Sequence, residues 1–169
     1  DDLNTVTLGE VVLQGSQTKV KLIALEKETE VPDSTGLVAK QQVERFRREL
    51  LADGAKLASG DRVEVELILE SKNDYEYLLL EDHKPSGFEP DDQRSGYIFE
   101  GLTAYRELRD DRVSFFLTSL ARGQHSISYR LRAETPGRMS ALPATIEGMY
   151  SPELVGNSDE FKLKVNDRE

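Results

Sequence analysis

Apolar and polar residues alternate with a period of two along most of the chain, and this pattern predicts half-buried β-strands. The clearest run covers residues 62–70, where Val63, Val65 and Leu67 fall on one face. Similar runs occupy residues 11–25 (two runs separated by a turn), 75–80, 113–119, 126–132 and 161–165. We therefore expect about seven strands.

Turn-forming residues separate these runs, at Gly60-Asp61, Pro85-Ser86-Gly87, Arg122-Gly123-Gln124 and Pro136-Gly137. Another turn pair, Asn73-Asp74, lies between two of the runs and predicts a β-hairpin there. Short strands with turns at this spacing are typical of antiparallel sandwiches. The sequence therefore predicts an all-β fold, a two-sheet antiparallel β-sandwich.

The inward-facing positions of the strands predict the hydrophobic core. They are Val63, Val65, Leu67, Leu78, Leu80, Phe115, Leu117, Ile127, Tyr129, Phe161 and Leu163. At ~25 cal/mol per Å² of buried apolar area, such a set and its neighbours offset the ordering entropy of a domain without a disulfide.

Two segments carry mixed signals. Val43, Phe46 and Leu50 recur at helical spacing, which favours a helix, yet residues 37–43 also fit a strand. In residues 95–108 the apolar side chains share one helical face, and a glycine weakens the pattern. We expect a short helix or an irregular crossover between the sheets in this second segment.

Charge and length narrow the range of partners. The chain has 169 residues with 22 Lys and Arg against 32 Asp and Glu, a formal net charge of −10. Such a charge repels phosphate backbones, so we expect no nucleic-acid partner. No apolar run reaches the ~20 residues that span a bilayer, so we expect no membrane span. The chain begins at Asp1 without a signal segment, and we expect it to be a piece of a longer protein.

The sequence offers few candidate residues for metal binding or catalysis. The chain has no Cys and two His, too few for a thiolate or histidine-based zinc site. His83 follows Asp82, but neighbouring residues in a strand point to opposite faces and cannot form a catalytic dyad. His125 has no nucleophile at a known spacing. We therefore expect a non-enzymatic domain without metal or cofactor.

Two acidic pairs could bind a divalent cation through carboxylate oxygens. One is Asp110-Asp111, flanked by Arg109 and Arg112, and the other is Asp91-Asp92 after a proline. The favoured interpretation of both is a turn in which a carboxylate caps backbone N–H groups and nearby arginines neutralise the charge.

The stretch of residues 148–154, Gly-Met-Tyr-Ser-Pro-Glu-Leu, has an unusual composition for a loop between two strands. A flexible thioether in Met149 and an amphipathic ring in Tyr150 are suited to a contact surface. The alternative is that both side chains close one end of the core, which is the more common arrangement for a tyrosine. Both interpretations stay open at this point.

Several motifs, in this order, resemble the C-terminal domain of alpha-2-macroglobulin-like proteins. Their sequences are closer to those of the bacterial branch. They are Gly60-Asp61-Arg62-Val63, the residues 77–90, Arg109-Asp110-Asp111-Arg112-Val113 before Phe115-Phe116, residues 129–133 before Pro136-Gly137, and Met149-Tyr150-Ser151-Pro152-Glu153. The resemblance covers about residues 36–168. It implies a β-sandwich with one short crossover helix within residues 95–108, and a strand rather than a helix over residues 37–47.

The resemblance also implies a domain division. Residues 1–34 look like the terminal strands of a preceding β-module, or they form the edge of the sandwich. Residues 35–169 are then the C-terminal macroglobulin-type β-sandwich domain.

Parent proteins of this family trap proteases, and many carry a reactive Cys–Gln thioester. Without any Cys, this chain would be a non-catalytic module whose partners are other domains of the parent chain, a thioester-type domain among them, and target proteases through the parent. In bacterial members a loop tyrosine shields the thioester, and the resemblance places Tyr150 there, so that Met149, Tyr150, Ser151, Pro152 and Glu153 form the binding loop. Export to the periplasm or cell envelope is implied as well.

A competing hypothesis is an independent adhesion or carbohydrate-binding β-sandwich of an exported protein. Such a domain would present a row of exposed aromatic rings on one sheet face. Tyr75, Tyr77 and Tyr129 are the candidates for that row.

Overall fold

The computed structural model describes the backbone of residues 8–13, 16–27, 46–51, 53–71, 73–99 and 101–168, and most side chains from residue 51 onward. Within these residues the chain forms fifteen strands and no helix. Their bounds are β1 (Leu8–Leu13), β2 (Ser16–Lys27), β3 (Phe46–Leu50), β4 (Ala55–Ala58), β5 (Arg62–Ser71), β6 (Tyr75–His83), β7 (Phe88–Pro90), β8 (Gly96–Ile98), β9 (Ala104–Leu108), β10 (Arg112–Leu120), β11 (Gly123–Ala133), β12 (Gly137–Ala141), β13 (Thr145–Gly148), β14 (Ser151–Asn157) and β15 (Phe161–Asn166).

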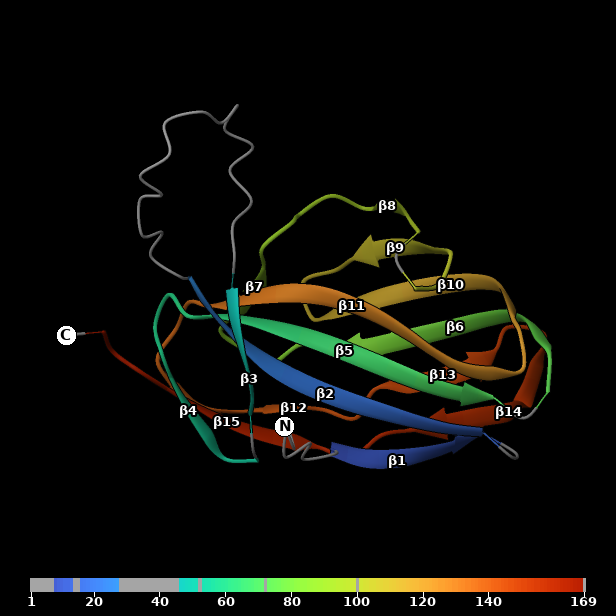
Figure 1. Ribbon diagram of the computed structural model, residues 1–169, viewed down its shortest axis with the longest axis horizontal. Coiled ribbons are helices and arrows are strands. Elements are labelled where there is room, and N and C mark those ends of the chain that lie inside the picture. Colours follow the sequence, from blue (N-terminus) through green and yellow to red (C-terminus); the bar gives the residue numbers. More distant parts are fainter. Residues whose placement is uncertain are drawn as a thin grey trace, which may run out of the picture.

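These strands form three sheets, named here after one strand of each. The β5 sheet has the order β1-β2-β5-β11-β7, with β3 also pairing with β2; the β6 sheet has the order β14-β13-β6-β10-β9-β8; the β15 sheet has the order β12-β15-β4. The β5 and β6 sheets are the two layers of the sandwich, and the small β15 sheet lies at the end near the C-terminus (Figure 1). Only β15 and β4 pair in parallel among these strands. The predicted antiparallel β-sandwich is confirmed.

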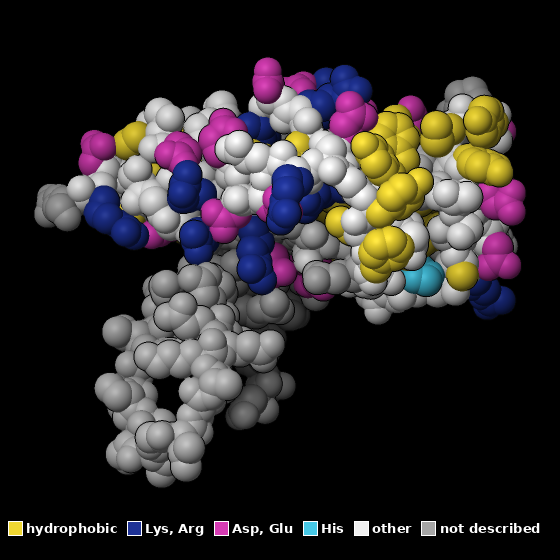
Figure 2. Space-filling model, turned by 90° about the horizontal axis from the view of Figure 1, so that it is seen from above, with side chains coloured by type: hydrophobic (Ala, Val, Ile, Leu, Met, Phe, Trp, Pro, Cys, Tyr) yellow, Lys and Arg dark blue, Asp and Glu magenta, His cyan; other side chains and the backbone are white. Residues whose placement is uncertain are grey.

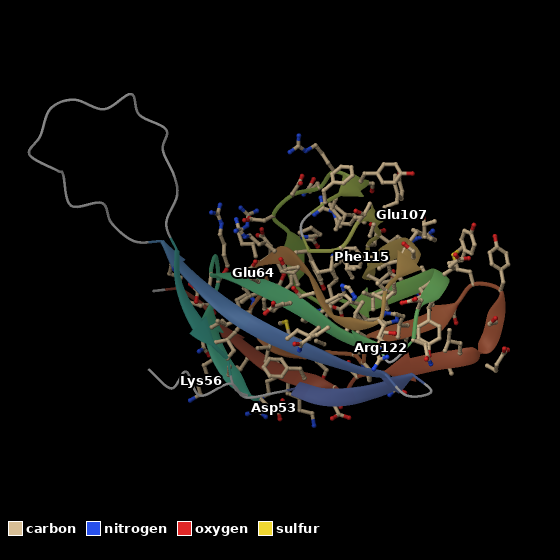
Figure 3. All side chains as sticks on the ribbon, turned by 45° about the vertical axis from the view of Figure 1, so that its right-hand side comes forward. Asp53, Lys56, Glu64, Glu107, Phe115 and Arg122 are labelled. Atoms are coloured by element: carbon tan, nitrogen blue, oxygen red, sulfur yellow. The ribbon has the colours of Figure 1, made fainter. Side chains whose placement is uncertain are left out.

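The core lies between the inner faces of the β5 and β6 sheets. All eleven predicted core residues are buried, with exposed fractions of 5% or less. Register explains why they meet: Leu67 lies opposite Ile127 and Val65 opposite Tyr129, so the inward residues of β5 and β11 form continuous rows. Phe115, labelled in Figure 3, faces these rows from β10, and its ring centroid lies 6.0 Å from that of Tyr129.

The hairpin predicted at Asn73-Asp74 is wrong. β5 pairs with β2 and β11, whereas β6 pairs with β10 and β13, so the two strands belong to different sheets. The connection is an arch across the core. A period-two pattern cannot distinguish the two cases, because a strand buries the same alternate residues whether the next strand lies beside it or opposite it.

The crossover helix expected within residues 95–108 is also wrong. This segment forms β8 and β9, which pair antiparallel with Tyr97 opposite Tyr105. Leu102, which fitted the helical face, is buried in the connection between these strands. Gly101 has a φ of +77°, and a Cβ there would lie 2.2 Å from the carbonyl oxygen of Ser126. The glycine therefore allows the connection to approach β11 closely, which a helix would not need.

The amino-terminal part is described only in places. β2 pairs with β5 in register from Gln17 to Leu25, so these residues extend the β5 sheet, with β1 at its edge. The strand expected over residues 37–47 lies outside the described residues except for its last two, which begin β3. The boundary between residues 34 and 35 also lies outside them and stays a prediction.

The buried row on β5 makes a stability prediction. Leu67 is fully buried at 0% exposure, so Leu67→Ala should lower the free energy of unfolding by about 2–5 kcal/mol, through lost apolar burial and a cavity. Urea denaturation measures this. Leu142→Ala is the matched control, because Leu142 is 53% exposed and should change stability by less than about 0.5 kcal/mol. Equal midpoints for both variants would contradict the assignment of the core.

Candidate functional site

The β13–β14 hairpin presents the candidate residues at its tip. β13 ends at Gly148 and β14 begins at Ser151, so Met149 and Tyr150 form the turn between them. Tyr150 is 79% exposed and Met149 is 45% exposed. The interpretation of Tyr150 as a residue that closes the core is therefore wrong, and its ring faces solvent.

The turn depends on Gly148. Gly148 pairs with Ser151 across the hairpin, while the preceding pair is Glu147 with Val155. Three residues of β14 are thus unopposed and form a bulge. A Cβ on Gly148 would lie 2.9 Å from the backbone carbonyl oxygen of Ser151, closer than side chains approach. Only glycine allows this tight closure, which directs the turn outward.

Tyr77 supports the turn from the neighbouring strand β6. Its carbonyl oxygen accepts a hydrogen bond from the Met149 N–H at 2.8 Å. Its ring meets the Tyr150 ring edge-to-face, with centroids 5.5 Å apart and an interplanar angle of 80°. Tyr77 has a φ of +55°, the one positive φ among the described non-glycine residues, and such a conformation costs about 1–2 kcal/mol. We name Tyr77, Met149 and Tyr150 the tip cluster.

The structure places the predicted binding loop on this one hairpin. Met149, Tyr150 and Glu153 are exposed, and Ser151 is half-buried. Pro152 lies within β14, and its side chain is outside the described ones. The sequence pattern did not connect Tyr77 to this loop. No signal could have done so, because the contact depends on an irregular backbone conformation of a residue more than seventy positions earlier.

A buried polar pair joins the two layers of the sandwich. The Tyr129 hydroxyl on β11 donates a hydrogen bond of 2.7 Å to Oδ2 of Asp82 on β6. Burial raises the pKa of Asp82 to about 6, partly offset by this hydrogen bond. Burial and the nearby Asp82 carboxylate raise the pKa of Tyr129 well above its usual value. The pair sits within the core, apart from the tip cluster, and acts in packing.

Arginines neutralise the acidic pairs that the sequence offered as cation ligands. Asp111 pairs with Arg112 at 2.7 Å, which lowers the pKa of Asp111. Asp92 binds Arg94 and Arg106, whose hydrogen bonds lower its pKa to about 2. Among the residues whose side chains are described, no group of three or more His, Asp or Glu side chains could hold a metal ion.

The two histidines and the remaining acidic residues show ordinary local contacts. The Nε2 atom of His125 lies 2.8 Å from the carbonyl oxygen of Ala121. Asp91 pairs with Arg62 at 3.2 Å. His83 is half-buried next to the buried Asp82, in keeping with the opposite directions of neighbouring strand residues. Asp110 is exposed, and the carboxylate cap predicted for it is absent from the hydrogen bonds of the described residues.

The row of aromatic rings expected of a carbohydrate-binding face does not form from the predicted residues. Tyr129 is buried and Tyr75 is half-buried, which leaves Tyr77 as the exposed one of the three. Other rings are exposed: Tyr97 is 69% exposed and Phe99 is 76% exposed. Hydrophobic side chains gather toward one end of the surface shown in Figure 2.

Comparison with known proteins gives the family. Residues 23–153 match the model of the bacterial alpha-2-macroglobulin MG10 domain, more than half of the chain. The chain belongs to this family.

Relatives and solved structures of the family are much longer than this chain. An alpha-2-macroglobulin homolog of Nostoc sp. is 28% identical over 120 residues, which cover 66% of this chain and 6% of the relative. The Circularly permutated Ras protein 2 of Dictyostelium discoideum is 29% identical over 111 residues, 66% of this chain and 3% of the relative. The chain thus spans a small part of the curated relatives it matches.

Solved structures share the fold. Native alpha-2-macroglobulin of Escherichia coli matches with a TM-score of 0.66 and 20% identity, over 96% of this chain and 10% of the other. The Salmonella protein reacted with methylamine gives 0.65 and 21%, over 94% and 10%. An E. coli structure that spans domain MG7 to the C-terminus gives 0.62 and 21%, over 92% and 24%.

Within the described part of the chain, no helix has the length and hydropathy that a bilayer crossing requires.

The Asp82–Tyr129 pair predicts a pH dependence of stability. The folded-state pKa of about 6 lies above the usual pKa of an aspartate, 3.8, so the folded chain binds this proton more tightly than the unfolded chain. The contribution of Asp82 to stability should therefore increase as the pH falls, by about 1 kcal/mol between pH 7 and pH 5. Asp82→Asn cannot titrate and should lack this increase.

Urea unfolding at pH 5, 6 and 7 tests this through the difference between the wild-type chain and Asp82→Asn. The exposed Asp110→Asn removes one carboxylate outside the core and is the matched control. A difference for Asp82→Asn that stays constant from pH 5 to pH 7 would contradict the raised pKa of Asp82.

The exposure of Tyr150 predicts a small effect on folding. Tyr150→Ala removes a ring that is 79% exposed and its contact with Tyr77, so the free energy of unfolding should fall by less than about 1 kcal/mol. Phe115→Ala, at 0% exposure, should lower it by about 3–5 kcal/mol. Comparable losses in the two denaturation curves would show that Tyr150 packs in the core.

Proposed function

We propose that this chain is a non-catalytic domain at the C-terminal end of a bacterial alpha-2-macroglobulin-like protein. Residues 35–169 form the domain, and residues 1–34 are the terminal strands of a preceding module or the edge of the sandwich. The domain contacts other domains of the parent and holds the parent in its resting state. The parent traps target proteases and is exported to the periplasm or cell envelope.

The binding loop of Met149, Tyr150, Ser151, Pro152 and Glu153 contacts the thioester-type domain of the parent. The observation that carries this proposal is the 79% exposure of Tyr150 at a two-residue turn. A large ring held out in solvent by a tight backbone gains stability only when a partner covers it. The bulge of β14 and the lack of a side chain on Gly148 allow the tight turn that holds Tyr150 in solvent.

The loop acts by excluding water. A thioester hydrolyses when water reaches its carbonyl carbon, and a tyrosine ring laid over it leaves no room for a water molecule. The hydroxyl at the far end of the ring can still bond to polar groups or solvent. The ring needs a fixed orientation to do this, and the edge-to-face contact with Tyr77 supplies a fixed wall on one side. The chain has no Cys, so it supplies the shield and the partner supplies the reactive bond.

Several findings support the position and the setting of the domain. The family model matches most of the chain. A solved E. coli fragment that runs from domain MG7 to the C-terminus contains a stretch with the same fold. The chain spans 10% of the solved alpha-2-macroglobulins of E. coli and Salmonella, which supports a modular role among many neighbours.

The intact parent protein tests the shield. Tyr150→Gly should speed the appearance of the free thiol in buffer at least tenfold, measured with a chromogenic thiol reagent in the absence of protease. Tyr150→Phe keeps the ring and should stay within twofold of the wild type. Leu142→Ala changes an exposed apolar residue away from the tip and is the control. An unchanged rate for Tyr150→Gly, or a parent without a hydrolysable thioester, would overturn the shielding role.

A further inference from the structure

A continuous row of residues crosses the outer face of the β6 sheet from edge to edge. Directly opposite residues on neighbouring strands point to the same face. The register links Tyr97 to Tyr105, Tyr105 to Phe116, Phe116 to Leu79, Leu79 to Glu147, and Glu147 to Val155. All six strands contribute one residue each, and five of the six residues are apolar. We name this set the apolar row.

The inner-face neighbours show that the row faces outward. Leu78 and Leu80 on either side of Leu79 are fully buried, as are Phe115 and Leu117 on either side of Phe116. The row itself is exposed at both ends, with Tyr97 at 69% and Val155 at 52%. It extends about 24 Å across the sheet at the usual strand spacing.

Aromatic contacts make half of the row a preformed surface. The ring centroids of Tyr97 and Tyr105 lie 5.3 Å apart, and those of Tyr105 and Phe116 lie 6.4 Å apart. Phe99 stacks beside Tyr97 at 6.4 Å. Rings already packed against one another lose little side-chain entropy on binding, which favours them as anchors of an interface.

One flank of the row is electrostatically self-contained. Glu107, labelled in Figure 3, pairs with Arg109 at 2.9 Å. Glu81 pairs with Arg112 at 3.3 Å and accepts a hydrogen bond from the Ser114 hydroxyl at 3.0 Å. These charges already have partners within the domain, so a docking partner does not have to neutralise this flank.

The other flank, together with Glu147 of the row itself, is acidic. Glu76, Glu147 and Glu153 are exposed and lie within three positions of the tip cluster along the chain, and none of them makes an ion pair with another described residue. Three carboxylates beside exposed apolar side chains create a local negative potential. A partner that covers the apolar row must also place positive charge against this flank, since otherwise the carboxylates lose water without compensation.

We propose that the outer face of the β6 sheet docks a neighbouring domain of the parent chain, through an apolar strip flanked by Lys or Arg side chains. The inference rests on the proposed function, because the row runs up to the tip cluster and the same neighbour covers both. A second copy of the chain fits poorly, because two copies that each carry a net charge of −10 repel each other, whereas a partner with positive charge is attracted. The apolar row anchors the neighbour, and the acidic flank sets its orientation.

Cysteine labelling tests whether the row is covered. The chain has no Cys, so each of Tyr97→Cys, Val155→Cys and Leu142→Cys introduces one thiol whose peptide is followed by mass spectrometry. In the intact parent, the two row positions should label at least tenfold more slowly than in the isolated chain. Leu142 is exposed away from the row, so Leu142→Cys is the control. The factor by which its labelling slows in the intact parent should be at least fivefold smaller than the factor for either row position. Any other pattern overturns the proposal, including slower labelling of the isolated chain at higher concentration, which would identify a second copy as the occupant.

Charge reversal tests the chemistry of the partner. Glu147→Lys combined with Glu153→Lys should reduce the protection of Val155→Cys three- to tenfold, where protection is the labelling rate in the isolated chain divided by that in the intact parent. The ratio cancels the direct effect of a lysine at position 147 on the reactivity of the thiol opposite it. Glu160→Lys is the matched control at an exposed position beyond the other end of β14, and it should change the protection less than twofold. Equal protection for the double variant and the control would exclude a basic partner.

The two proposals fail in different ways. If Tyr150→Gly leaves thiol release unchanged while the row stays protected, the shield is wrong and the docking surface stands. If the row labels at the same rate in both forms while Tyr150→Gly still speeds thiol release, the docking surface is wrong and the loop acts alone.

Discussion

The packing of the β5 sheet against the β6 sheet is the constraint on which the rest of the structure depends. Because neighbouring strand residues point to opposite faces, each side chain committed to the core directs the next one outward. Phe115 lies in the core at 0% exposure, and Phe116 therefore joins the outer face. The exposed surface of the β6 sheet is thus the complement of its buried one, and a change of register by one residue would exchange the two.

Periodicity was sufficient for much of this fold, because burial on one face of a strand leaves a direct trace in the sequence. The eleven core residues that this trace predicts lie on β5, β6, β10, β11 and β15, and all of them are buried. The pairing of the strands could not be found in this way. The pattern around Leu67 and Leu78 is the same whether their strands lie side by side or face each other across the core. The pattern over β8 and β9 favours a short helix or an irregular crossover, because the three residues of β8 are too few to show a period of two.

The candidate site, like the fold, could be predicted only in part. The composition of residues 148–154 marked Met149 and Tyr150 as unusual, and the resemblance to a family selected the loop. The support from Tyr77 and the buried contact between Asp82 and Tyr129 could not be found in this way. Each depends on two residues brought together from distant strands, at 2.7 Å in the buried pair and at a centroid distance of 5.5 Å in the exposed one. A single sequence holds no record of such pairings.

The parallel pairing of β15 with β4 has a consequence for how the chain folds. The two strands are joined at their ends by a hydrogen bond from the Lys162 N–H to Asp53, across 109 residues of sequence. β15 follows every other described strand in chain order, so β4 has no partner until the last of them has been synthesised. Contacts of such long range are costly in loop entropy and form late. During synthesis β4 therefore has no partner on either side, and completion of the β15 sheet is the step that pairs one of them.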